Sequence, residues 1–152
     1  MVRLANQYVI FELADEFYGV DIHQVRGIEK PMSLTRVPNA PEFVQGVCNL
    51  RGSVIPVIDL RRRLGLSAGT ETKNTRVLIV NVDKYTVGMV IDNANDVVNI
   101  NPDMIEPSPA LVSGIDSEFI RGVAKINNRL LVLLDLNKIL SVQEISDLEQ
   151  IN

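Results

Sequence analysis

The side chains best suited to chemistry in this 152-residue chain are its only histidine, His23, and its only cysteine, Cys48. A cysteine beside a histidine can act as a nucleophile, and both residue types bind zinc. Cys48, however, lies between apolar residues in a strand-like pattern, which favours a small buried side chain over a reactive thiolate. A single histidine also cannot form a histidine cluster for a metal. We therefore expect neither a nucleophilic enzyme nor a metal site.

The carboxylates that stand out in the sequence have structural explanations. Asp59 and Asp135 each end a strand-like run, where a carboxylate can cap the free N–H groups of a short helix that follows. Asp15 belongs to a predicted turn, and Glu144 follows Ser141 at the spacing of a capping box. Glycine-rich phosphate loops are absent from the sequence. The sequence therefore predicts a binding module without catalytic residues, metal or cofactor.

A repeated stretch provides the elements that would position any functional residue. Residues 43–64 align without a gap on residues 119–140 at an offset of 76. About one or two identities would be expected by chance, and six positions are identical. We interpret the stretch as one structural unit used twice. The identical pairs are Phe43 with Phe119, Gly46 with Gly122, Val47 with Val123, Asp59 with Asp135, Leu60 with Leu136 and Leu64 with Leu140.

Each copy of this stretch predicts a β-hairpin. Two apolar runs flank a polar tip, which is Arg51-Gly52 in the first copy and Asn127-Asn128 in the second. Glycine and asparagine tolerate the positive φ of a tight hairpin. Earlier in each half, residues 8–22 align on residues 77–91 at an offset of 69 and predict another hairpin. Each half of the chain therefore begins and ends with a hairpin.

The remaining segments are predicted as short strands, loops and a terminal helix. Residues 25–29 and 94–100 each predict a strand beside a proline-bearing connection. Residues 65–74 are small and polar, as in a surface linker. In residues 141–152, an apolar stripe of Ile145 and Leu148 predicts a C-terminal helix.

About five short strands in each half predict an all-β fold of two small five-stranded barrels with short helices, because barrel closure leaves no unpaired edges. We expect one domain over residues 1–152. The first barrel should span about residues 7–64 and the second about 75–140, with boundaries that allow elements to be exchanged.

Charge and hydropathy argue against several protein classes. The net charge of −4 and the pI of about 5.0 disfavour binding to nucleic acid. A barrel for single-stranded nucleic acid stays open as an alternative, but its stacking aromatics are scarce at 5% with no tryptophan. The basic run of Arg61, Arg62 and Arg63 predicts a solvated helix face. No apolar run approaches the length of a membrane span, so we expect a cytosolic protein.

The second hairpin of the first half resembles the core motif of the CheW family, the coupling proteins of bacterial chemotaxis. The resemblance rests on NLRG at residues 49–52 and VIPVIDL at residues 54–60, and it extends from Tyr8 to the terminal helix. It implies two SH3-like barrels and a non-enzymatic adaptor that joins the histidine kinase CheA to the cytoplasmic tips of chemoreceptors. The regulatory domain of the kinase would pair with this protein barrel to barrel. An adaptor of a non-flagellar chemosensory array is an alternative that the sequence leaves open.

The resemblance also implies a receptor-binding surface near the junction of the barrels. The family often has glutamate at the position of Gly27, and Glu29 would point from the same strand face two residues on. The recurrence of Gly46 in both halves favours a backbone role for this residue. The charge of Arg51 is not demanded by the repeat, because its counterpart is Asn127. The implied receptor-binding residues are Val25, Gly27, Glu29, Gly46, Arg51 and Val97.

Overall fold

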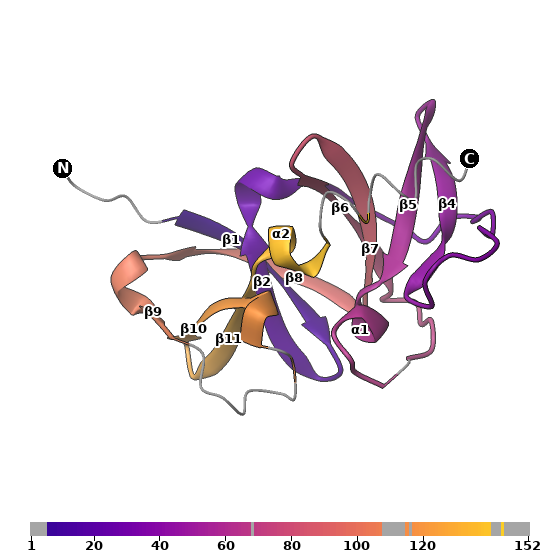
Figure 1. Ribbon diagram of the computed structural model, residues 1–152. Coiled ribbons are helices and arrows are strands. Elements are labelled where there is room, and N and C mark those ends of the chain that lie inside the picture. Colours follow the sequence, from indigo (N-terminus) through magenta and orange to yellow (C-terminus); the bar gives the residue numbers. More distant parts are fainter. Residues whose placement is uncertain (1–5, 68, 108–114, 116, 141–143, 145–152) are drawn as a thin grey trace.

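The computed structural model describes residues 6–67, 69–107, 115, 117–140 and 144, which form two β-sheets side by side (Figure 1). The first subdomain is a six-stranded sheet with the order β8-β1-β2-β11-β10-β9, and the second is a five-stranded sheet with the order β3-β6-β7-β5-β4. The strands are β1 (Asn6–Leu13), β2 (Glu16–Asp21), β3 (Val25–Glu29), β4 (Val44–Leu50), β5 (Ser53–Asp59), β6 (Arg76–Val82), β7 (Tyr85–Ile91), β8 (Asn93–Ile100), β9 (Ile105–Glu106), β10 (Ile120–Ile126) and β11 (Arg129–Leu134).

The predicted all-β fold with two SH3-like barrels is confirmed, with one difference in strand number. The first subdomain has a sixth strand, because the two-residue β9 pairs with β10 through Glu106 and Val123. The equivalent contact in the second subdomain is a single bridge between Thr35 and Val47. The extra strand is therefore a slightly longer version of a contact that both subdomains make.

The two halves of the chain exchange their first hairpins. Strands β1 and β2 pair with β8 and β11 of the second half, whereas β6 and β7 pair with β3 and β5 of the first half. Each subdomain therefore combines strands of both halves, which is the exchange of elements that the expected boundaries of about 7–64 and 75–140 allowed. A hairpin forms locally, but its next neighbour in the sheet is selected by non-local packing.

The hairpin tips have the backbone that their residues predict. Arg51 and Gly52 have φ values of 51° and 90°, and Asn127 and Asn128 have 52° and 65°. These are left-handed conformations, which suit the two-residue turns of twisted hairpins. The repeated tips are thus confirmed as equivalent turns, one in each subdomain.

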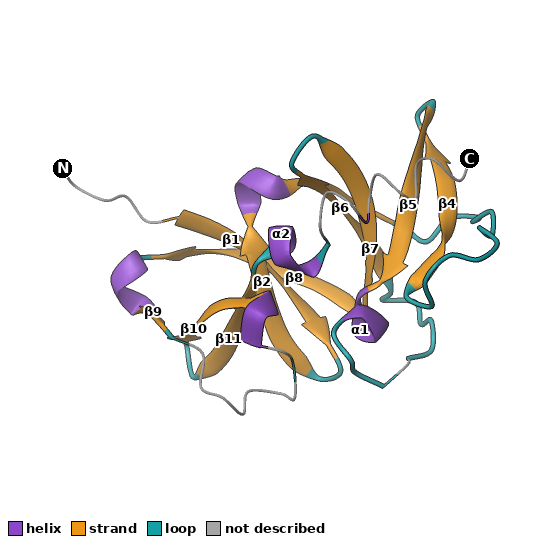
Figure 2. Ribbon diagram, in the orientation of Figure 1, coloured by secondary structure: helices purple, strands orange, loops and turns teal. Residues whose placement is uncertain are grey.

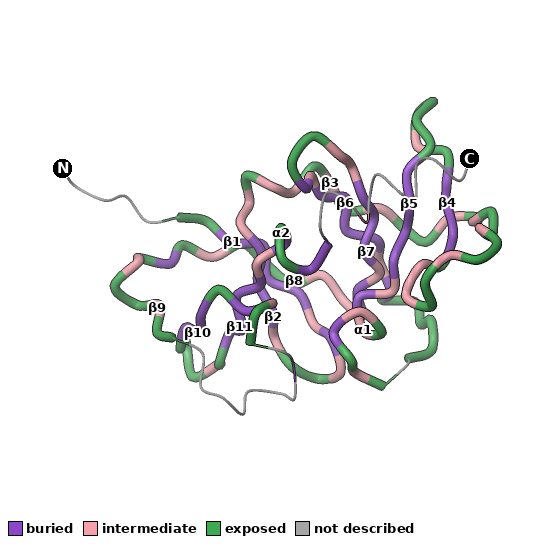
Figure 3. Tube along the Cα trace, viewed as in Figure 1, coloured by how far each residue is buried: buried purple, intermediate pink, exposed green. Residues whose placement is uncertain are grey.

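Three groups of buried apolar side chains hold the fold together. One group lies within the first subdomain and includes Tyr8 and Leu131, and another lies within the second and includes Cys48 and Ile79. The largest group joins the subdomains, because it combines buried residues of β1 and β2 with those of β6 and β7 (Figure 3). Separating the two subdomains would expose this shared core to water.

Short helices precede or follow several strands (Figure 2). The α-helices are α1 (Leu60–Arg63) and α2 (Leu136–Ile139), and the 3₁₀ helices are η1 (Ile22–Gln24), η2 (Pro102–Met104) and η3 (Ser117–Phe119). The predicted caps are confirmed: Asp59 accepts a hydrogen bond of 3.1 Å from the Arg61 N–H, and Asp135 one of 3.1 Å from the Asn137 N–H. Apart from Glu144, the predicted C-terminal helix at residues 141–152 lies outside the described residues.

Candidate functional site

The candidates for nucleophilic chemistry have different environments. Cys48 is buried in β4, whereas His23 is exposed in η1. Burial raises the pKa of the Cys48 thiol, because desolvation disfavours the thiolate. In the described part of the chain, no group of three or more His, Cys, Asp or Glu side chains could hold a metal ion. The predicted buried position of Cys48 is confirmed.

This burial predicts slow thiol chemistry. Native Cys48 should react with a thiol reagent far more slowly than the same cysteine in denaturant, because reaction requires both opening of the barrel and ionisation. The rate should increase with pH above the range of an ordinary thiol, since the raised pKa keeps the group protonated. A labelling time course at several pH values measures this, and native labelling as fast as in denaturant would contradict it.

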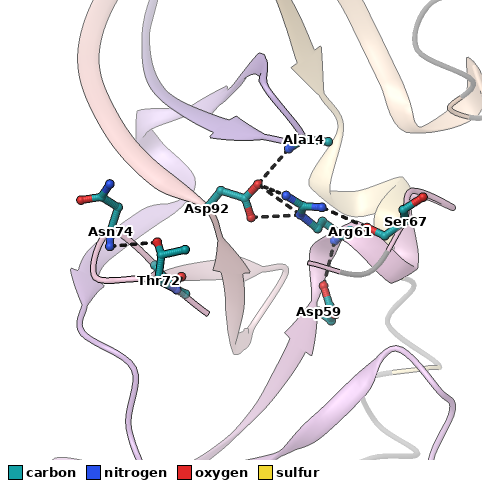
Figure 4. A network of polar contacts seen from close by, with 8 residues as sticks. Ala14, Asp59, Arg61, Ser67, Thr72, Asn74 and Asp92 are labelled. Atoms are coloured by element: carbon teal, nitrogen blue, oxygen red, sulfur yellow. Dashed lines mark hydrogen bonds and ion pairs between the residues drawn. The ribbon is translucent and has the colours of Figure 1, made fainter. Parts of the chain in front are cut away.

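Two arginines of the basic run in α1, Arg61 and Arg63, do not form the solvated helix face that the sequence predicts. The Arg61 Nε donates to both carboxylate oxygens of Asp92, at 3.0 and 3.1 Å, and Nη2 also donates to this carboxylate. The same carboxylate accepts a 2.8 Å hydrogen bond from the Ala14 N–H (Figure 4). The hydrogen bond to Asp92 raises the pKa of Arg61 above the already high value of an ordinary arginine. Arg61 and Asp92 therefore tie α1 and the end of β7 to the β1–β2 turn.

Arg63 also departs from the predicted solvated face. Its Nε donates a 2.6 Å hydrogen bond to the carbonyl oxygen of Ile139, the residue that aligns with Arg63 at the repeat offset. The guanidinium carbon lies 4.7 Å from the ring centroid of Phe43 and 5.4 Å from that of Phe119, which is the repeat counterpart of Phe43. Arg63 thus joins equivalent parts of the two halves where they meet.

Three of the six predicted receptor-binding residues meet in the second subdomain. Gly27 and Glu29 of β3 and Arg51 of the β4–β5 turn line one cavity of about 300 Å³. Arg51 Nη2 lies 3.2 Å from Glu29 Oε2, and the exposed fractions of the two side chains are 75% and 27%. The guanidinium is therefore the more accessible of the two charges, and the carboxylate that positions it comes from β3.

The other three predicted residues lie outside this cavity lining. Val25 is half-buried and packs against the shared core. Val97 is 49% exposed on β8 of the first subdomain. Gly46 is buried at a β-bulge of β4, so it can influence a surface only through the backbone.

Sequence reasoning missed six further residues that line the same cavity. Their residue types did not indicate a binding site, since most of them are ordinary strand residues. A comparison of the two repeats, position by position, could have found Ser53 and Thr86, because their counterparts are the much larger Arg129 and Phe17. The additional lining residues are Arg26, Leu50, Ser53, Ile55, Ile79 and Thr86.

A search of the described residues finds no helix that is long and apolar enough to cross a membrane.

Comparison with known proteins supports the family suggested by the NLRG motif. The chain is 34% identical to the chemotaxis protein CheW of Klebsiella aerogenes over 94% of this chain and 86% of that protein. It is 37% identical to the chemotaxis protein CheW of Bacillus subtilis, over 91% and 89% of the two chains.

The fold also matches a solved structure. The crystal structure of the scaffolding protein TtCheW from Thermoanaerobacter tengcongensis has a TM-score of 0.84 and 35% identity to this chain, and the match covers 94% of this chain and 92% of that one. The protein-family model of the CheW-like domain matches residues 7–144 of this chain. The chain therefore belongs to the CheW-like domain family.

Proposed function

We propose that this protein is a non-enzymatic adaptor of chemotaxis, which couples chemoreceptors to the histidine kinase CheA in signal transduction. The observation that carries the proposal is the match of the CheW-like domain along nearly the whole chain. The adaptor would lie in the cytoplasm and join receptor arrays through its partners. Its two subdomains offer separate surfaces, so that kinase and receptor can bind together.

In this proposal the receptor tip binds at Gly27, Glu29 and Arg51. The exposed guanidinium supplies a charged anchor, and Val25 and Val97 would extend the contact. Helix docking on an apolar surface with one charged anchor is a common recognition mode. Gly46 would shape this surface through the bulge of β4. The regulatory domain of CheA would pair with a barrel surface elsewhere.

Arg51→Ala tests the receptor contact. The variant should weaken binding of a receptor-tip fragment about thirtyfold, as expected when an interface anchor worth roughly 2 kcal/mol is lost. Stability should change little, because exposed ion pairs such as that with Glu29 contribute about 0–1 kcal/mol. Calorimetry measures receptor and kinase binding separately, and kinase affinity should be retained.

Two outcomes would contradict this assignment. Wild-type affinity of Arg51→Ala for the receptor fragment would remove Arg51 from the interface. Absence of any binding between the wild-type protein and the CheA of the same organism would contradict the adaptor function itself.

A further inference from the structure

Three side chains fill one end of the first subdomain. Phe17 of β2 packs against the core of this subdomain and pairs with Leu131 across the parallel β2–β11 ladder. The guanidinium carbon of Arg129 lies 4.8 Å from the Phe17 ring centroid. Its Nη2 lies 3.7 Å from a carboxylate oxygen of Asp96. An aromatic plug, covered by an arginine and an aspartate, therefore fills this end of the sheet.

The second subdomain lacks all three parts of this plug. The counterparts of Phe17, Asp96 and Arg129 are Thr86, Gly27 and Ser53, at the repeat offsets of 69 and 76. The offset holds in the structure, since Val77 pairs with Glu29 just as Tyr8 pairs with Val98. All three small residues line the 300 Å³ cavity. The cavity thus occupies the place where the other subdomain has its plug.

The strand ladder is also shorter at this end of the second subdomain. The parallel pairing of β5 with β7 runs from Val57 with Gly88 to Asp59 with Val90. It does not reach Ile55 and Thr86, although their counterparts Leu131 and Phe17 are paired. The ladder therefore ends two residues before Ile55 and Thr86, which line the cavity.

The cavity lining has an apolar floor and a charged rim. The buried side chains of Ile55 and Ile79 lie at its base, together with Leu50. Its rim carries the guanidinium groups of Arg26 and Arg51 and the carboxylate of Glu29. Two cations against one anion leave the rim net positive. Such a site suits an apolar group that enters beside a negative charge.

We infer that this cavity accepts an apolar side chain, up to the size of phenylalanine, from a partner segment that has an acidic residue beside it. The size follows from Phe17, which fills the equivalent place. The acidic neighbour follows from the net positive rim, where Arg51 can exchange Glu29 for the carboxylate of the partner. The inference rests on the proposed function, because the segment belongs to the receptor tip that docks at Arg51.

Thr86→Phe tests the inference by adding the missing plug. This variant should lower affinity for a soluble receptor-tip fragment by about tenfold or more, since the apolar anchor loses its site. Thr86→Val is the matched control, because it removes the same hydroxyl, with its bonds to Arg26 and Asn81, without filling the cavity. It should bind within about threefold of wild type. Thermal unfolding and kinase binding report whether each variant is folded.

Gly27→Val fills the cavity from a second lining position and replaces Thr86→Phe if that variant does not fold. A β-carbon at Gly27 would lie 3.8 Å from its nearest neighbour, Glu29 Oε2, so the backbone accepts a side chain. Wild-type affinity in a folded, filled variant would overturn the inference while the proposed function stands. If the wild-type protein itself does not bind the fragment, the proposed receptor function fails, and the inference fails with it.

Glu29→Gln tests the acidic neighbour. Removal of this carboxylate frees Arg51 for the partner, so receptor affinity should rise about threefold, with a steeper dependence on salt. Weaker binding of Glu29→Gln would show that Glu29 supports the receptor contact, through Arg51 or through a cation of the partner, which would contradict the inferred exchange of Glu29 for an acidic residue.

Discussion

Gly46→Ala should destabilise the protein by about 3 kcal/mol or more, which is a large effect for one methyl group. A β-carbon on Gly46 would lie 2.6 Å from the carbonyl oxygen of Thr35 and 3.2 Å from the Leu34 side chain. Gly46 also has a φ of +154°, which residues with a side chain rarely adopt. Thr35 cannot easily move, because its backbone exchanges hydrogen bonds of 2.8 and 2.9 Å with Val47.

Gly27→Ala is the control for this prediction. It adds the same methyl group to a glycine of the same subdomain, but at an ordinary contact distance of 3.8 Å from Glu29 Oε2, and should change stability by less than about 1 kcal/mol. Urea unfolding curves of both variants make the comparison. Equal free energies of unfolding for the two variants would show that the close approach of the Thr35 carbonyl oxygen to Gly46 is unimportant. If Gly46→Ala unfolds as expected, its loss of receptor binding would reflect folding instead of a lost contact.

Arg63→Ala should lower the free energy of unfolding by about 3 kcal/mol, because several interactions depend on one side chain. The substitution removes the donor to the Ile139 carbonyl oxygen, at 2.6 Å, and leaves that buried acceptor without this partner. It also removes the cation–π contacts with Phe43 and Phe119. The ion pair with Glu144 is partly exposed and adds less.

Arg62→Ala provides the matched control within the same helix. Arg62 is 43% exposed, and its partner Glu42 is 88% exposed, so its removal should cost less than about 1 kcal/mol. Denaturant unfolding of the two variants side by side measures the difference. A cost at Arg63 no larger than that at Arg62 would mean that Arg63 does not hold the two halves together.

The position of Arg63 explains why the basic run was misjudged from sequence. Three consecutive arginines after a helix cap have the composition of a solvated face, and residue type alone does not separate Arg61 and Arg63 from Arg62. The partner of Arg61 is Asp92 and that of Arg63 is Ile139, and both partners lie far away in the chain. Only packing brings these groups beside α1.

The candidate site shows a similar division. The charge of Arg51 was identified because the repeat has Asn127 in its place, and the position of Glu29 on the same strand face as Gly27 followed from β periodicity. The ion pair of 3.2 Å between Glu29 and Arg51 depends on how β3 approaches the β4–β5 turn. Val97 and Val25, named with them from the family resemblance, contribute nothing to the same cavity lining.

The local and repeated features of this protein follow directly from its sequence. It predicted the tight tips at Arg51-Gly52 and Asn127-Asn128, the caps at Asp59 and Asp135, and the buried Cys48, since each depends on residues close in the chain. The exchange of hairpins between the halves, and the Phe17 plug in one subdomain against the cavity at Thr86 in the other, become visible only in the folded chain. These features depend on contacts between distant segments, whose free energy comes from shared burial and not from the preference of any single stretch.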